Sequence, residues 1–135
     1  MFKLIVAVLL TSISIAANAQ WIEYAQEESG PIYYEKSRVA STGAGILVWE
    51  KFVMDQEALR EAIKENPSFN NYSHTLTKNF YNCHTYQYRK SSVYAYLKDG
   101  KLLLSNPNVE GSHYQDVVPD SVKDKLMKII CKDKS

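Results

Sequence analysis

The stretch VVPDSVKDKLMKIIC, residues 117–131, predicts a short amphipathic helix near the end of the chain. Pro119 has a fixed φ that suits a helix entry, and Asp120 or Ser121 can cap the first free N–H groups. Apolar residues then recur at helical spacing and define the stripe that we expect to be buried: Val122, Leu126, Ile129 and Ile130. The charged residues between them are expected to face water: Lys123, Asp124, Lys125 and Lys128. Because an isolated helix of this length is marginal in water, the stripe must pack on another element.

The N-terminal residues have the pattern of a secretory signal peptide. An apolar run over 4–15 follows a basic residue and leads to small residues that end at Ala19. We expect cleavage after Ala19, which removes residues 1–19 and leaves 20–135 as one domain. Since the next residue is Gln20 and not cysteine, no N-terminal lipid is expected. We predict an exported protein, periplasmic or secreted, with no membrane span in the mature chain.

The chain has two cysteines, Cys83 and Cys131. In an exported chain this number indicates one disulfide, because the compartment is oxidising. The bond closes a loop of roughly 49 residues, for which the chain-entropy model gives on the order of 4 kcal/mol of stabilisation. We therefore expect the C-terminal helix to be tied back to the middle of the chain.

The remainder of the chain predicts a sheet. Segments with strand character, separated by turn residues, are 20–25, 32–35, 46–54, 72–83, 85–97 and 102–104. Both faces of 46–54 are apolar, which places that strand centrally, whereas 55–66 predicts a short surface helix inserted between strands. Ser91-Ser92 is a candidate bulge. The expected fold is α+β, a single antiparallel sheet of about six strands with the C-terminal helix packed on one face.

Composition and motifs exclude several classes of function. The 16 basic and 15 acidic residues nearly balance, which favours neither nucleic acid nor an anionic membrane surface. The three histidines lack metal-ligand spacing, and the sequence has no glycine-rich phosphate loop and no serine elbow. No catalytic residue, metal site or cofactor is therefore predicted.

One enzymatic alternative places a thiolate at Cys83 with His84 as its base. Neighbouring residues in a strand point to opposite faces of a sheet, which separates these two side chains. The second cysteine is the simpler partner for Cys83. This alternative predicts a free thiol in the exported protein, and the disulfide predicts none.

Tyrosine is unusually frequent, with ten residues in the chain, and four of them share a parity along one predicted strand: Tyr86, Tyr88, Tyr94 and Tyr96. The simpler interpretation is a half-buried sheet face on which aromatic residues pair across strands. The functional interpretation is a recognition surface, because tyrosine provides a large contact area with a polar tip. One helix cannot cover both faces of such a sheet, so the uncovered face is the candidate surface for a partner or for self-association.

Several landmarks follow one another in a recognisable order: Trp21, Tyr33-Tyr34, Trp49-Glu50-Lys51, Asn82-Cys83, Tyr88-Arg89, Asp99-Gly100-Lys101, Val118-Pro119-Asp120-Ser121-Val122 and Cys131. This order resembles the bacterial surface-adhesin protein E family over nearly the whole mature chain. The resemblance implies an antiparallel sheet with a C-terminal helix, a disulfide between the two cysteines, and export in a Gram-negative bacterium. It also implies binding of host extracellular-matrix and serum proteins such as laminin, vitronectin and plasminogen, and the ability to form homodimers.

The leading hypothesis is thus an exported, non-enzymatic binding protein whose contact surface is the tyrosine-bearing sheet face. The alternative is a soluble periplasmic accessory or inhibitory protein that acts on an endogenous partner. Cell fractionation separates these two hypotheses, because an adhesin must reach the cell exterior.

Overall fold

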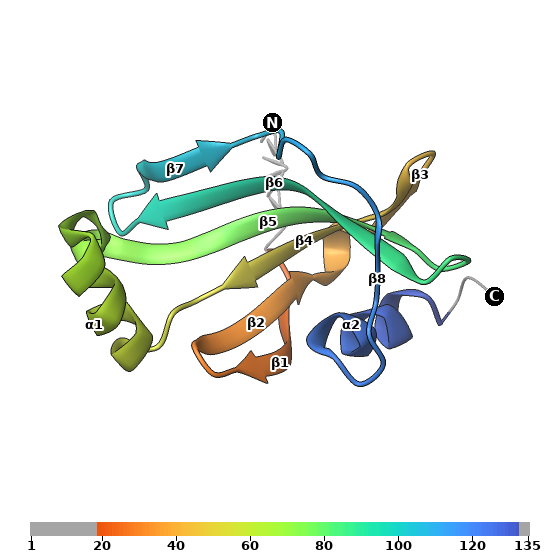
Figure 1. Cartoon of the computed structure of the whole chain (residues 1–135), viewed down its shortest axis with the longest axis horizontal. Coiled ribbons are helices and arrows are strands. Elements are labelled where there is room, and N and C mark those ends of the chain that lie inside the picture. Colours follow the sequence, from red (N-terminus) through yellow and green to blue (C-terminus); the bar gives the residue numbers. More distant parts are fainter. Residues whose placement is uncertain (1–18, 133–135) are drawn as a thin grey trace, which may run out of the picture.

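The structure is a computed structural model and describes residues 19–132 (Figure 1). Apart from Ala19, the predicted signal peptide lies outside the described residues. Within 19–132, no helix combines the length and the apolar character needed to cross a membrane.

Eight antiparallel strands form one sheet, and six of them follow the path β1-β2-β4-β5-β6-β7. These six are β1 (Trp21–Glu27), β2 (Gly30–Glu35), β4 (Gly45–Phe52), β5 (Tyr72–Asn82), β6 (Gln87–Leu97) and β7 (Leu102–Asn106). The short strands β3 (Ala40–Thr42) and β8 (Gln115–Asp116) pair with β4 and β6. The helical elements are η1 (Lys36–Arg38), α1 (Gln56–Glu65), η2 (Pro67–Asn71) and α2 (Val122–Ile130). The predicted α+β fold is confirmed, and the strand predicted to be central, β4, lies inside the sheet.

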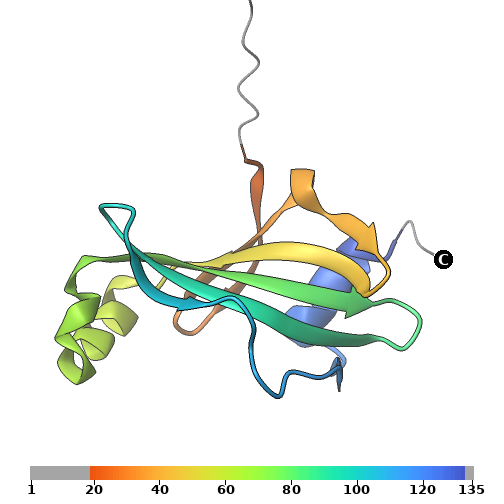
Figure 2. The same cartoon turned by 90° about the horizontal axis from the view of Figure 1, so that it is seen from above.

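The two α-helices lie at opposite ends of the sheet, whose long strands curve along their length (Figures 1 and 2). α1 begins where the Asp55 side chain accepts the N–H of Ala58 at 2.8 Å, and it ends before Pro67. None of its residues is fully buried. This confirms the predicted surface helix.

α2 builds the core together with the strands it covers. Its N-cap is Ser121, whose hydroxyl accepts the N–H of Asp124 at 3.2 Å. The buried apolar cluster consists of Tyr34, Ile46, Val48, Tyr81, Val117, Leu126, Met127 and Ile130. Apolar burial of this kind stabilises a folded chain by roughly 1.5–3 kcal/mol per large side chain before the loss of entropy.

The predicted orientation of α2 was wrong for Ile129, Asp124 and Lys123, and the burial of Met127 was missed. Lys123, expected to face water, has a side chain that is 25% exposed and lies 3.0 Å from Glu50 Oε1. Ile129, expected to be buried, is 44% exposed, whereas Met127 is fully buried. Asp124, expected to face water, is only 4% exposed, because its carboxylate accepts the Tyr86 hydroxyl and the main-chain N–H of Asp120. These polar contacts turn the helix so that Asp124 faces the protein.

The predicted disulfide joins Cys83, which follows β5, to Cys131, the C-cap of α2. Their Cα atoms are 5.8 Å apart. The bond holds the end of the helix at the turn between β5 and β6. With its sulfur in this bond, Cys83 is not a free thiolate, so the enzymatic alternative is wrong for the oxidised protein.

Replacing both cysteines, Cys83→Ser with Cys131→Ser, is expected to lower the free energy of unfolding by about 2–5 kcal/mol, because the unfolded chain gains freedom. Urea unfolding of the oxidised wild type and the double variant measures this loss. A reductant should bring the wild type close to the variant and leave the variant unchanged. Equal midpoints for the two oxidised proteins would contradict the expectation.

Candidate functional site

The register of the sheet defines two faces. One row of directly paired residues crosses six strands on one side: Glu23, Tyr33, Lys51, Leu76, Tyr94 and Ser105. The adjacent row faces the other side: Ile22, Tyr34, Glu50, Thr77, Val93 and Asn106. We call the second side, which packs against α2, the helix face, and the first side the open face.

A bulge at Ser91 divides the four predicted tyrosines between these faces. Lys78 pairs with Ser92, but its neighbour Asn79 pairs with Lys90, so Ser91 is an extra residue in β6. Residues before and after the bulge therefore have opposite parity. The bulge itself was predicted, but the prediction that all four tyrosines share one face was wrong.

Tyr86 and Tyr88 belong to the helix face. The Tyr88 ring stacks on the Tyr81 ring with centroids 6.1 Å apart, and the Lys123 ammonium lies 5.2 Å from the Tyr88 centroid. Tyr86 has a positive φ of 55° and donates its hydroxyl to Asp124, which, together with burial, raises the pKa of Tyr86 to about 12. Both tyrosines help to hold α2.

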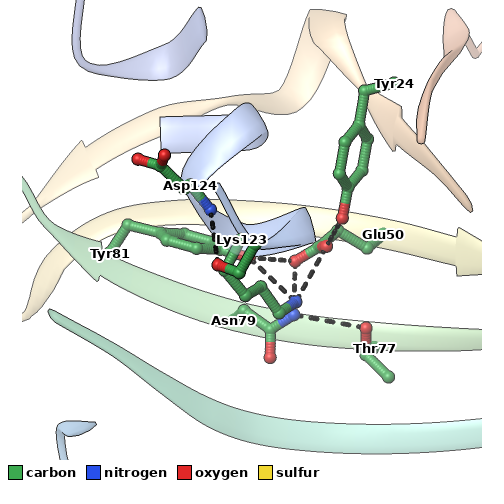
Figure 3. Close-up of polar contacts among 8 residues, drawn as sticks. Tyr24, Glu50, Thr77, Asn79, Tyr81, Lys123 and Asp124 are labelled. Atoms are coloured by element: carbon green, nitrogen blue, oxygen red, sulfur yellow. Dashed lines mark hydrogen bonds and ion pairs between the residues drawn. The ribbon is translucent and has the colours of Figure 1, made fainter. Parts of the chain in front are cut away.

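Glu50 is the centre of a buried hydrogen-bond network beneath α2 (Figure 3). Its side chain accepts hydrogen bonds from Tyr24, Tyr81 and Asn79. The Lys123 ammonium of α2 lies 3.0 Å from Glu50 Oε1. Burial raises the pKa of Glu50, but the Lys123 charge and the three donors outweigh it, so the pKa lies below the ordinary value. The carboxylate is therefore ionised at neutral pH.

The partners of Glu50 are held in their neutral or paired states. Burial and the negative charge of Glu50 raise the pKa of Tyr24 and of Tyr81 well above the ordinary value. Both hydroxyls thus remain protonated donors at neutral pH. The ammonium of Lys123 is paired with Glu50. The geometry of this network suits the docking of α2 on the sheet. One acceptor, Asn79 Oδ1, is buried without a hydrogen-bond partner in the described structure.

Tyr94 and Tyr96 lie on the open face and line a hollow of about 270 Å³. Its other lining residues are Ala19, Trp21, Glu35, Arg38, Trp49 and Leu76. The Trp49 and Tyr94 rings are 6.2 Å apart between centroids, and the His74 ring stacks on Tyr96 at 5.0 Å. Neither α1 nor α2 contributes to this lining. The structure thus brings Tyr94 and Tyr96 together with two tryptophans that the sequence analysis had not connected to them.

Basic side chains cover several aromatic rings of the open face. The Lys51 ammonium lies 4.8 Å from the Trp21 ring centroid and 5.1 Å from that of Tyr33. Lys78 lies 5.8 Å from the Trp49 centroid. These are cation–π distances, and they give the open face a positive charge over an aromatic surface.

Glu35 closes one end of the hollow and is 1% exposed. Its Oε1 accepts the N–H and hydroxyl of Ser37 at 3.1 and 2.6 Å and the N–H of Gln20 at 2.8 Å. The Arg38 Nε lies 3.4 Å from its Oε2. Burial raises the pKa of Glu35, but these hydrogen bonds and the Arg38 charge together lower it. Glu35 is a charged group built into the N-terminal end of the open face.

Comparison with known proteins agrees with this architecture. The sequence matches the family described as surface-adhesin protein E over residues 21–132. The chain belongs to this family. The match begins at the first residue of β1 and continues past Cys131, so it includes the sheet, α2 and the disulfide.

A similar solved structure is the selenomethionine form of protein E from Haemophilus influenzae. Its TM-score is 0.58 at 14% sequence identity, with 87% of this chain and 90% of that chain covered. At this identity the likeness shows a shared fold. A search of curated proteins gave no match. Family membership and fold therefore describe this chain as an adhesin-like protein of the surface-adhesin protein E type.

Glu50→Gln tests the network, because it keeps the side-chain shape and removes the charge that pairs with Lys123. We expect a loss of about 3 kcal/mol in the free energy of unfolding at pH 7, measured by urea unfolding. Glu61→Gln is the matched control, since Glu61 forms an exposed pair with Lys64 at 3.0 Å and should change stability by less than about 0.5 kcal/mol.

The same variants predict the pH dependence. The pKa of Glu50 is lowered by folding, so its stabilisation is present above the unfolded value of about 4.3 and is lost as pH falls through the folded value. The gap between wild type and Glu50→Gln should therefore shrink in acid. A gap that stays constant from neutral pH down to acid unfolding would contradict the assigned ionisation of Glu50.

Proposed function

We propose that this protein is an exported binding protein that attaches to host extracellular-matrix or serum proteins through its open face, and that it acts by binding and not by catalysis. The observation that carries the proposal is the aromatic hollow beside Tyr94 and Tyr96, with basic side chains stacked on the surrounding rings. Membership of the surface-adhesin protein E family supports a role as an exported or surface-located binding protein.

The hollow has the composition of a protein-binding hot spot. Tryptophan and tyrosine are enriched where interfaces gain most of their free energy, and the open face presents Trp21, Trp49, Tyr94 and Tyr96 around one cavity. A volume of about 270 Å³ is large enough for one aromatic or branched side chain of a partner. Tyr94 and Tyr96 therefore remain the proposed contact residues, whereas Tyr86 and Tyr88 are assigned to the core.

Charge defines the kind of partner. Lys51, Lys78 and Arg89 all stack over aromatic rings, Arg89 at 4.9 Å from the Phe80 centroid, and all three belong to the open face. Such a surface favours a partner segment that combines acidic and apolar side chains. Charged contacts of this type accelerate association at low salt and weaken as salt screens them.

The test is binding of the oxidised protein to purified laminin, vitronectin and plasminogen, measured by surface plasmon resonance at two salt concentrations. We expect Trp49→Ala and Tyr94→Ala each to weaken binding at least about tenfold, in the range of a hot-spot residue. Lys78→Glu should slow association, and Lys64→Glu on the exposed side of α1 is its matched control. Ile129→Ala, exposed on α2, is the apolar control.

Each outcome has a distinct meaning. Loss of binding in the open-face variants with retention in both controls supports the proposal. Binding that all variants retain would place the contact elsewhere. No binding to any matrix or serum protein, with the protein confined to the periplasm, would favour the periplasmic accessory function. Concentration-dependent dimers that Tyr94→Ala abolishes would assign the open face to self-association.

A further inference from the structure

The main-chain nitrogen of Gln20 lies 2.8 Å from Oε1 of the buried Glu35. Gln20 is also the residue that becomes the first of the mature chain if the signal peptide is cleaved after Ala19. Cleavage at this bond changes the nitrogen from an amide with one N–H to an ammonium with a positive charge and three N–H groups. The structure therefore places a buried carboxylate at the position where the new charge arises.

We propose that removal of the signal peptide after Ala19 completes the fold, because the new α-ammonium of Gln20 forms an ion pair with the buried carboxylate of Glu35. The proposal needs export and this cleavage site, and it does not need the identity of a partner.

The position of Gln20 is fixed independently of its charge. Its carbonyl oxygen accepts the N–H of Lys36 at 3.0 Å, and the next residue, Trp21, pairs with Glu35 in the β1–β2 ladder. The new ammonium thus stays where the amide nitrogen lies. The hydrogen bond to the Glu35 carboxylate already has a charged acceptor, and a positive charge on the donor adds Coulomb attraction to it without rearrangement.

Glu35 also has unused capacity for a donor. Its Oε2 is buried and receives no hydrogen bond from the described residues. The ion-pair partner of this oxygen is Arg38, whose side chain is 70% exposed and therefore screened by water. An ammonium at Gln20 adds a second positive charge beside the carboxylate, 2.8 Å from Oε1.

Cleavage also changes the open face, because Ala19 lines the aromatic hollow together with Trp21, Trp49, Tyr94 and Tyr96. Removing Ala19 opens that wall. This consequence rests on the proposed function, whereas the ion pair does not. A precursor that keeps its leader would present a narrower hollow than the mature protein.

The first experiment is the intact mass of the exported, oxidised protein, which should correspond to a chain that starts at Gln20. The second compares the unfolding midpoints of proteins that start at Gln20 and at Ala19. We expect the Gln20 form to be more stable at neutral pH. The ion pair is expected to raise the α-amino pKa of the folded protein above its unfolded value of about 7.7. The extra stability of the Gln20 form is therefore complete below a pH of about 7.7 and disappears as pH rises through the folded pKa.

Other charged or titratable groups around the contact are common to both proteins, so their effects cancel when the two unfolding midpoints are compared. They are Arg38 of η1, Lys51 of β4, His74 of β5, and Tyr94 and Tyr96 of β6. Glu35→Gln in both proteins should abolish the difference between the two starts. Glu27→Gln, an exposed carboxylate at the other end of β1, is the matched control and should preserve it.

A further readout uses the wild-type sequence and does not depend on whether Glu35→Gln folds. An N-terminal glutamine cyclises when its uncharged α-amino nitrogen attacks its side-chain amide carbon; a new N–C bond forms, the amide C–N bond breaks, and ammonia leaves. An ammonium has no free electron pair for this attack. We expect the folded Gln20 form to lose ammonia at least about tenfold more slowly than the same protein in urea, together with an NMR-measured α-amino pKa raised by about one unit.

The results that overturn the proposal are a different first residue, equal midpoints for the two starts across the pH range, or an ordinary α-amino pKa with equal cyclisation rates in the folded and unfolded chain. A failure to bind matrix proteins would not overturn it. If both starts fail to bind while the pH-dependent difference persists, the proposed function is wrong and the ion pair stands.

Discussion

The fold depends on the burial of one carboxylate, Glu50. A buried carboxylate without partners costs several kcal/mol, so this side chain is tolerated only when its donors are in place. Those donors come from β1, from β5 and, through Lys123, from α2. Glu50 therefore favours one docking position of the helix over others. The Cys83–Cys131 bond holds the C-terminal end of the same helix, so both ends of a nine-residue element are fixed on the sheet.

The bulge at Ser91 lets one strand serve two purposes. Before the bulge, Tyr88 stacks on Tyr81 in the core, and after it Tyr94 lies beside Trp49 on the open face. Without the bulge, both tyrosines would lie on one face of the sheet. Either the core under α2 would then lack the Tyr88 ring, or the aromatic hollow would lack the Tyr94 ring. α2 covers only one end of the sheet (Figure 1). The residues of β6 before the bulge therefore face the core under α2, and those after the bulge have the opposite parity.

Most of the fold could be predicted from local patterns, whereas the sites depend on long-range packing. The strands, the inserted helix after Asp55 and the Ser121 cap all have short-range signals. The disulfide joins residues 48 apart and could be predicted because the exported chain has two cysteines. The sequence also contained a signal for Glu50, since it shares the parity of Ile46 and Val48 in an apolar strand and thus requires partners. Its partner Lys123 lies 73 residues away, and no local pattern reveals that contact. Likewise, Ser91-Ser92 indicated a bulge, but the faces of the tyrosines beyond it follow only from the pairing with β5.

The open face combines half-buried aromatic rings with protection against non-specific association. The Lys51 and Lys78 ammonium groups lie over the rings of Trp21, Tyr33 and Trp49, so their alkyl stems cover apolar area while the charges remain in water. Each such contact is worth about 0.5–1 kcal/mol at an exposed site, which a partner can replace with small loss. The same charges repel other positively charged surfaces, including the open face of a second copy. A specific partner must therefore supply both acidic groups for the lysines and an apolar side chain for the hollow. Because both are required, a surface rich in tryptophan and tyrosine can still be selective.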